Sequence, residues 1–290
     1  MDSLKKILKR AEKQGVAIGH FNISDSSGLR AIFETARELN VPILIGVSEG
    51  EAKFLGVRQA VALVQSLREE FNYPIFLNAD HSHSLDTVKA AVKAGYDSII
   101  FDGSKFPFEK NIKETKAAVE YIKSKNVDIL VEGEVGYIGS SSAIFDKLPE
   151  GAAVQEKDLT TPQEAVQFVR ETKVDLFSPA VGNIHGMFKN APNPRLNIAR
   201  IKAIKKAVKI PLVLHGGSGI ADEDFTEAIK AGINVVHINT EIRKAWREGL
   251  EVRLSEMPDE VAPYKLLDAS VDKIRKVVYN RLTLFSKSSQ

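Results

Sequence analysis

The amino-acid sequence predicts an α/β protein that folds as a single (β/α)8 barrel, the TIM barrel, with extra C-terminal helices. Short runs with strand composition recur along the chain, at residues 16–23, 42–48, 74–80, 98–104, 128–135, 175–182, 211–217 and 234–240. Amphipathic segments with helical spacing lie between them, and no change in composition marks a linker. Eight strand–helix units in series are typical of a closed parallel barrel, and a doubly wound open sheet is the alternative.

The helices of this barrel are expected at residues 27–40, 84–96, 161–173, 196–209 and 222–232. Ser84 and Thr161 stand at the start of two segments, where a side-chain oxygen can accept a free backbone N–H. Gly95 and Gly232 stand at two of the ends, where glycine readily takes the left-handed conformation that closes a helix. These boundary signals support the alternation of strands and helices.

Both ends of the chain predict helices outside the eight units. Residues 1–15 form an amphipathic pattern without a continuous apolar stretch, and no segment approaches the roughly 20 apolar residues of a membrane span. Beyond Thr240 the helical pattern continues, which predicts a C-terminal helical extension from about residue 241. We therefore expect one domain over residues 1–290, whose last helices cover the barrel or a partner subunit.

The composition excludes several classes of protein. The 290 residues are 43% hydrophobic, and 40 basic against 38 acidic residues give a net charge of +2. This balance gives no general attraction to nucleic acid or to membranes. With no cysteine there is no disulfide, no thiolate nucleophile and no thiolate metal ligand. We expect a cytoplasmic protein that binds neither nucleic acid nor membranes.

Four of the six histidines, His81, His185, His215 and His237, stand where a strand-like run ends. The carboxyl ends of barrel strands share one rim, so residues far apart in sequence meet there. Three neutral imidazoles with an open coordination position describe a catalytic zinc site, and His81, His185 and His215 are the predicted ligands. A single histidine is more often a hydrogen-bonded core residue, but three at one rim favour the metal.

Carboxylates accompany these histidines. Asp80 directly precedes His81, so it is a candidate general acid and base, or else a partner that orients His81. Asp102 and Glu134 end the next two strands and are predicted to face the same mouth, where they form a weaker second metal position. Glu132 shares a strand face with Glu134 and is equally well explained by a structural salt bridge.

A glycine-rich run after the seventh strand predicts an anion site. The runs HGGSG (215–219) and NTE (239–241) occupy the usual phosphate position of such barrels. Backbone N–H groups and the hydroxyls of Ser218 and Thr240 would point at the anion.

The segment 137–160 follows the strand that carries Glu132 and Glu134, is rich in glycine and serine, and shows no clear period. A long loop in a compact barrel is a lid or a disordered tip. The two carboxylates just before it favour the lid.

Five short motifs indicate a protein family more specifically together than any one of them does alone. They are NADH (78–81), FDGS with PFEKNI (101–104 and 107–112), VEGEVG (131–136), VGNIHGM (181–187) and LHGGSG (214–219). Together they resemble the class II, zinc-dependent ketose-bisphosphate aldolases, which include fructose-bisphosphate and tagatose-bisphosphate aldolases. The resemblance runs from HFNI (20–23) to the helix after Thr240.

The resemblance implies roles for individual residues. Asp80 matches the family's proton donor and acceptor, and Asn22 within HFNI is expected to contact substrate. The positions that match zinc ligands are His81, His185 and His215, and those that can hold a second divalent ion are Asp102 and Glu134. The positions that match the grip on dihydroxyacetone phosphate are Gly186, Gly216, Gly217, Ser218 and Thr240. A monovalent cation, Na⁺ or K⁺, near that phosphate is also implied.

The implied reaction is the reversible cleavage of fructose 1,6-bisphosphate to dihydroxyacetone phosphate and glyceraldehyde 3-phosphate, a step of glycolysis and gluconeogenesis. Zinc would stabilise an enediolate while Asp80 takes the C4 hydroxyl proton. Tagatose bisphosphate or another phosphorylated ketose is an alternative substrate. A metal-dependent sugar-phosphate isomerase or epimerase is the alternative from another class, and the intact Asp80 weighs against a non-catalytic descendant.

Two positions depart from the family pattern. The strand-eight motif has an asparagine where this sequence has His237, so we expect His237 or Asn239 to supply the amide's hydrogen bond. The family's long loop carries an acid that enolises the triose phosphate. Here the matching stretch is GSSSAIFDKLPEG (139–151), in which Asp146 and Glu150 are the acids, and Glu150 is the predicted mobile base.

The sequence offers fewer suitable residues for binding the phosphate at the other end of the substrate. Ser48 and Glu49 follow the second strand and face the region expected for the far phosphate, where a glutamate is unfavourable. An arginine such as Arg253, from a neighbouring subunit, would then be required. The added C-terminal helices and the resemblance favour a homodimer or homotetramer.

Overall fold

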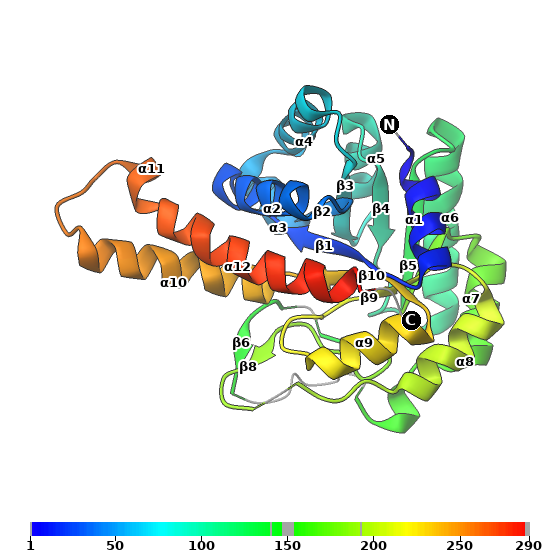
Figure 1. The fold of residues 1–290 in the computed structure, drawn as a ribbon. Helices are drawn as coiled ribbons and strands as arrows, with labels where there is room; N and C mark the ends of the chain where they lie inside the picture. Colours follow the sequence, from blue (N-terminus) through cyan, green and yellow to red (C-terminus); the bar gives the residue numbers. More distant parts are fainter. Residues whose placement is uncertain (1, 140, 147–153, 192, 288–290) are drawn as a thin grey trace.

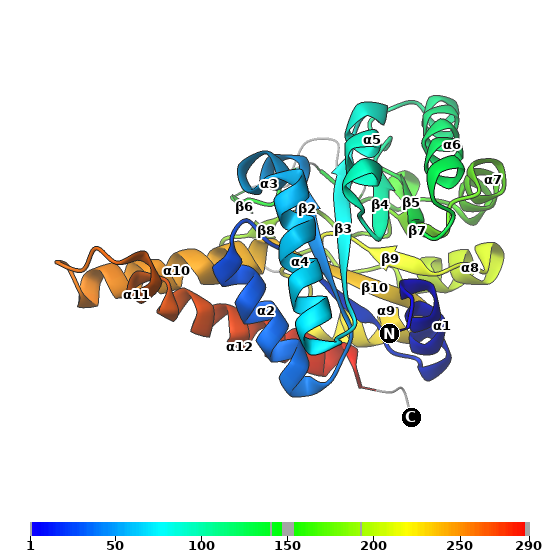
Figure 2. The same ribbon diagram turned by 90° about the horizontal axis from the view of Figure 1, so that it is seen from above.

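The computed structural model describes residues 2–139, 141–146, 154–191 and 193–287. Parallel strands form a closed barrel in the order β1-β10-β9-β7-β5-β4-β3-β2, and helices surround it (Figures 1 and 2). The barrel strands are β1 (Ile18–Asn22), β2 (Ile43–Ser48), β3 (Ile75–Ser82), β4 (Ser98–Phe101), β5 (Leu130–Val135), β7 (Leu176–Pro179), β9 (Leu212–Leu214) and β10 (Ile233–Ile238). Because β1 pairs with both β2 and β10, the predicted closed barrel is confirmed and the open sheet is wrong.

Helices follow the strands around the outside of the barrel. They are α1 (Leu4–Gln14), α2 (Ser26–Leu39), α3 (Glu49–Leu55), α4 (Val57–Phe71), α5 (Leu85–Ala94), α6 (Phe108–Lys125), α7 (Pro162–Thr172), α8 (Ile198–Val208), α9 (Asp222–Ala231), α10 (Thr240–Glu256), α11 (Pro263–Leu266) and α12 (Asp268–Phe285), with a 3-10 turn at Glu156–Asp158. None of the helices among the described residues is long and apolar enough to cross a membrane.

The predicted helix boundaries are confirmed at their caps. The side chain of Ser84 accepts the N–H of Thr87 at the start of α5, and Thr161 plays the same part for α7. Gly95 and Gly232 close α5 and α9 with φ values of 98° and 119°. Left-handed backbone of this kind suits glycine because it has no Cβ.

Apolar side chains close one end of the barrel and leave the other open. Strand residues and one face of α1 form a buried cluster, made of Leu4, Ile7, Leu8, Ala11, Ile18, Leu44, Phe76, Leu130, Leu176, Val213 and Val235. Burial of each large aliphatic side chain contributes about 1.5–3 kcal/mol. The apolar face of α1 thus packs against the amino ends of the strands.

Three strands end earlier than the composition predicts. β4 stops at Phe101, β7 at Pro179 and β9 at Leu214, so the apolar and glycine-rich residues that follow them form loops. These loops carry Asp102, His185 and His215 to the carboxyl rim of the barrel.

Two short strands outside the barrel connect its loops. β6 (Ile144–Phe145) and β8 (Met187–Phe188) pair in parallel, with Ile144 opposite Met187 and Phe145 opposite Phe188. The described part of the segment 137–160 is therefore fastened to the loop that carries His185.

The C-terminal helices form an arm. α12 packs along α10 and α2, and Figure 1 shows α10, α11 and the first part of α12 projecting away from the barrel. The last turns of α12 return to the barrel, where Val278, Leu282 and Phe285 are buried and the N–H of Ala17 donates to the carbonyl of Phe285 at 3.0 Å.

Candidate active site

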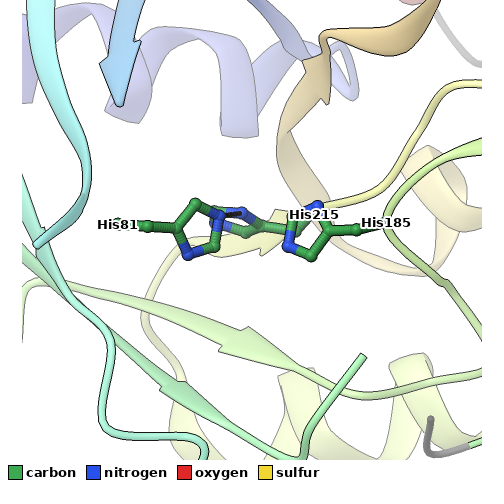
Figure 3. Close-up of side chains that lie close together, drawn as sticks. All are labelled: His81, His185 and His215. Carbon is green, nitrogen blue, oxygen red and sulfur yellow. Dashed lines mark hydrogen bonds between the residues drawn. The ribbon is translucent and has the colours of Figure 1, made fainter. Parts of the chain in front are cut away.

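Three histidines meet at the carboxyl end of the barrel. His81 lies in β3, and His185 and His215 lie in the loops after β7 and β9. One ring nitrogen of each lies within 4.8 Å of the others, and Figure 3 shows the three rings turned toward one another. His81 Nε2 and His215 Nδ1 are 3.0 Å apart. His81 has a φ of 55°, a left-handed backbone that aims its side chain across the barrel mouth.

The donor set of these histidines fits a zinc ion. Burial lowers the pKa of His185 to about 3 and that of His215 well below its ordinary value, so both imidazoles are neutral. Burial also acts to lower the pKa of His81, but Asp80 and Asp102 outweigh it and raise that pKa to about 10. The two neutral imidazoles and the nearby carboxylates favour a divalent cation, and His81, which keeps its proton beside these carboxylates, would have to release that proton to bind the same ion.

Asp80 lies beside the histidines and is buried. Its Oδ2 accepts a hydrogen bond from Asn22 Nδ2 at 2.8 Å. Its Oδ1 has no hydrogen-bond partner among the described residues and lies 3.6 Å from His81 Nε2 and 3.5 Å from His237 Nδ1. Burial acts to raise the pKa of Asp80, but His81 and His237 hold it well below its ordinary value. The carboxylate is therefore ionised, with one oxygen free to accept a proton.

Asp102 and Glu134 reach the other nitrogen of His81. The Nδ1 atom of His81 lies 3.1 Å from Asp102 Oδ2 and 3.6 Å from Glu134 Oε2. Ligand atoms of these three residues also lie within 4.8 Å of one another. Burial raises the pKa of Glu134 well above its ordinary value, and its Oε2 has no partner in the part of the chain that the structure describes. The two predicted metal positions thus share His81.

Glu132 contacts His215 rather than a lysine or arginine. Its Oε1 lies 2.7 Å from His215 Nε2. Both groups are buried, and this contact fixes the ring so that Nδ1 faces His81. The sequence left open whether Glu132 makes a structural salt bridge. The structure pairs it instead with His215, an imidazole of the site.

The glycine-rich loop adopts a shape that other residues cannot easily take. Gly216 has a φ of 62°, and a Cβ there would overlap the carbonyl oxygen of Ile184. The N–H of Gly217 donates to the carbonyl of His237 at 3.0 Å, and the N–H of Gly219 to Glu241 at 2.9 Å. Only part of the loop is therefore free to face an anion.

Ser218 links that loop to the first turn of α10. Its Oγ accepts the N–H groups of Asn239 at 3.3 Å and of Glu241 at 3.2 Å, which leaves its hydroxyl hydrogen free to donate. Thr240 lies beside it, buried at the start of α10. The hydroxyls of Ser218 and Thr240 both line the cavity described below.

His237 lies between two other imidazoles. Its ring stacks on His20 with centroids 3.4 Å apart, and lies 4.0 Å from the ring of His215. Burial lowers the pKa of His237 to about 3, so the ring is neutral. Asn239 Oδ1 is buried without a partner among the described residues. Either side chain can therefore offer a hydrogen bond to a ligand.

One cavity of about 240 Å³ is lined by most of the predicted site residues, namely Asn22, Asp80, His81, Asp102, His185, Gly186, His215, Gly216, Ser218, His237, Asn239 and Thr240. Glu134 and Gly217 are not among its lining residues. Its other lining residues include Ser48, Glu49, His83 and Arg243. Arg243 was not among the predicted site residues, although it lies three positions after Thr240 in the first turn of α10, and its guanidinium reaches Glu51 on α3. Arg253 does not line the cavity; it pairs with Asp268 at 2.7 Å and Glu256 at 3.0 Å on the arm.

The structure does not place either candidate base of the loop 137–160 in the cavity. Asp146 is exposed at the end of β6. Glu150, the predicted mobile base, lies outside the described residues.

Comparison with known proteins agrees with this geometry. The family model described as fructose-bisphosphate aldolase class-II matches residues 2–290. The chain belongs to the class II fructose-bisphosphate aldolase family. It is thus an aldolase, a lyase of a zinc-dependent family, as the resemblance in its motifs predicts.

Individual class II aldolases are similar over the whole chain. A fructose-bisphosphate aldolase of Geobacillus stearothermophilus is 33% identical over 291 residues, which cover 99% of this chain and 98% of that protein. A probable fructose-bisphosphate aldolase of Bacillus subtilis is 32% identical with the same coverage. The structure of the YdjI aldolase from Escherichia coli K12 superposes with a TM-score of 0.81 at 27% identity, covering 100% of this chain and 98% of that one.

Proposed function

We propose that this class II aldolase reversibly cleaves fructose 1,6-bisphosphate to dihydroxyacetone phosphate and glyceraldehyde 3-phosphate. One observation carries the proposal: three imidazole nitrogens within 4.8 Å of one another lie beside a buried carboxylate whose Oδ1 has no partner among the described residues. A metal site next to a free proton acceptor is what cleavage of a carbon–carbon bond beside a ketone requires.

His81, His185 and His215 would hold zinc. Zinc, when bound, supplies Lewis-acid stabilisation of the negative charge that develops on the ketone oxygen. Glu132 orients His215, and the pair of Asp102 and Glu134 is the proposed second divalent position. A monovalent cation, Na⁺ or K⁺, near the triose phosphate remains a prediction from the resemblance.

Asp80 is the proposed proton-transfer residue. In cleavage its Oδ1 takes the C4 hydroxyl proton while the C3–C4 bond breaks, and in condensation it returns that proton to the aldehyde oxygen. Asn22 holds the other carboxylate oxygen at 2.8 Å, and Asp80 is one of the residues that line the cavity. Glu150 is proposed as the base that exchanges the triose-phosphate proton.

The triose-phosphate end is proposed at the glycine-rich loop. Gly186, Gly216 and Gly217 allow close approach of backbone and ligand, and Ser218 and Thr240 supply hydroxyls. His237 or Asn239 would hydrogen-bond a hydroxyl near the reacting carbons. The single domain over 1–290, the homodimer or homotetramer and the cytoplasmic location stay predictions.

A coupled assay tests the proposal. Zinc-loaded protein is given fructose 1,6-bisphosphate, tagatose 1,6-bisphosphate or fructose 1-phosphate, and released triose phosphate is measured with and without a chelator. We expect release that stops when the metal is removed. An absence of triose phosphate from all three sugars, with the sugar isomerised or epimerised instead, would favour the second enzyme class.

A further inference from the structure

Glu51 is buried just behind the wall of the cavity on the side of β2, where its neighbours Ser48, Glu49 and Gly50 line the cavity. It lies in the first turn of α3, directly after β2, and β1 and β10 separate β2 from β9 in the barrel. Ser48 and Arg243 line the cavity at this end. With the triose phosphate at the glycine-rich loop, this end receives the other half of the substrate, which leaves as the aldehyde.

The carboxylate of Glu51 accepts hydrogen bonds from every side. Its Oε2 accepts from Asn22 Nδ2 at 2.9 Å, from Ser48 N at 2.8 Å and from Ser48 Oγ at 2.9 Å. Its Oε1 accepts from Arg243 Nη2 at 2.6 Å. Glu51 is 5% exposed. A guanidinium, a backbone amide, a hydroxyl and a side-chain amide are the donors that proteins use for a phosphate.

No comparable donors are left at this end for a second anion. Arg243 is the one arginine or lysine among the described residues that line the cavity, and Glu51 neutralises it. Glu49 also lines the cavity, with Oε1 accepting the N–H of His83 at 2.9 Å. With Glu49 in the lining and Glu51 behind it, two carboxylates stand against one guanidinium, and this negative balance repels a phosphate dianion.

We propose that Glu51, from behind the wall of the aldehyde half of the cavity, acts as an internal anion that occupies the donors of Ser48 and Arg243, so that the enzyme cleaves ketose 1-phosphates with a neutral far end in preference to the 1,6-bisphosphate. This inference rests on the proposed function and concerns which phosphorylated ketose the aldolase prefers. With fructose 1-phosphate the C3–C4 bond breaks, the C4 hydroxyl proton passes to Asp80, and C3 keeps the electron pair and is then protonated. The products are dihydroxyacetone phosphate and glyceraldehyde.

The test compares two sugars on the zinc-loaded enzyme. Release of dihydroxyacetone phosphate is measured with fructose 1-phosphate and with fructose 1,6-bisphosphate, and kcat/KM is obtained for each. We expect the ratio to favour the 1-phosphate by roughly tenfold or more. Preference for the bisphosphate overturns this inference but leaves the proposed aldolase intact. Release from neither sugar overturns both.

Variants of Glu51 decide whether this residue sets the preference. Glu51→Ala frees Asn22, Ser48 and Arg243, so the ratio should shift toward the bisphosphate by roughly tenfold or more. Glu51→Gln keeps an acceptor for the helix cap but no longer balances Arg243, so it should shift the ratio the same way by less. In Glu51→Ala with Arg243→Met, the cation is also lost and the gain should disappear.

A matched control separates specificity from folding. Glu51 is also the third residue of α3, where it completes a capping box with Ser48, and Glu164 has the same place on α7, where it does not line the cavity. Glu164→Ala should lower the melting temperature as Glu51→Ala does, with no change in the substrate ratio. If Glu51→Ala and Glu51→Gln slow both sugars equally, with the ratio unchanged, Glu51 is only a cap and the inference is wrong.

Discussion

Arg281, near the end of α12, holds Glu241 at the start of α10 through two hydrogen bonds, Nε to Oε2 at 2.9 Å and Nη2 to Oε1 at 2.8 Å. The same Oε1 accepts the N–H of Gly219 at 2.9 Å, in the loop that carries Ser218. The last helix is therefore tied to the proposed phosphate loop through one carboxylate, and Arg281 balances the charge of that carboxylate.

Loss of this pair should weaken binding of the phosphorylated end. In Arg281→Met, Glu241 stays beside the loop without a counter-charge, so KM should rise roughly three- to tenfold while kcat changes little. Steady-state kinetics with fructose 1-phosphate or the bisphosphate measures both values. Addition of Glu241→Gln removes the charge but keeps an acceptor for Gly219. It should lower the KM of the Arg281→Met variant part of the way back to that of the unaltered enzyme.

Arg275 supplies the control for this prediction. It lies on the same helix and pairs with Glu34 at 2.6 Å and Glu38 at 3.1 Å on α2, away from the cavity. Arg275→Met should lower the melting temperature without raising KM. Equal changes of KM in the two variants would mean that general loosening of α12 is responsible.

Asp80→Asn should abolish most turnover and leave the metal in place. The amide keeps an oxygen for Asn22 but cannot take the C4 hydroxyl proton, so kcat should fall roughly 10²–10⁴-fold. Metal analysis of the purified variant, beside the kinetics, checks the separation of the two roles. If zinc content falls together with turnover, Asp80 mainly supports His81 rather than moving a proton.

The barrel could be predicted from sequence because its signals are local. Apolar runs alternate with capped amphipathic helices, and Ser84 and Thr161 cap helices as their positions predict. The ends of the strands could not be predicted as well: the sequence predicts that β9 reaches residue 217, but it ends at Leu214, where the loop HGGSG begins. Its course depends on distant contacts, such as the bond from Asn183 Nδ2 to the carbonyl of His215 at 3.0 Å.

The gathering of His81, His185 and His215 could also be predicted, because barrel topology alone brings strand ends to one rim. The partners of these residues could not. Glu51 and Arg243 are 192 positions apart, and their contact depends on how two helices pack against neighbouring strands. Glu132 could be placed on the right strand face, but the choice of His215 as its partner needs the closed barrel.

Glu132→Gln should weaken zinc binding without unfolding the protein. The carboxyl group lies 2.7 Å from His215 Nε2, and an amide in its place accepts a weaker hydrogen bond from that ring, which makes the opposite nitrogen a poorer metal donor. We expect zinc affinity to fall roughly 10- to 100-fold, measured by competition with a chromogenic chelator. Glu164→Gln, the same change at a helix cap, should leave zinc affinity unaltered. Unchanged affinity in Glu132→Gln would show that the contact has no effect on the metal.

Gly186→Ala should damage the metal site through the backbone. Gly186 has a φ of 91°, and a Cβ there would lie 2.5 Å from the carbonyl oxygen of Ala143, so the loop next to His185 must shift. Left-handed strain alone costs about 1–3 kcal/mol, and the shift should lower both the melting temperature and the zinc content. Gly28→Ala is the control, because its Cβ would meet only Asp25 Oδ1, at 3.5 Å, within α2. Full zinc occupancy in Gly186→Ala would mean that β6 and β8 do not hold His185 in place.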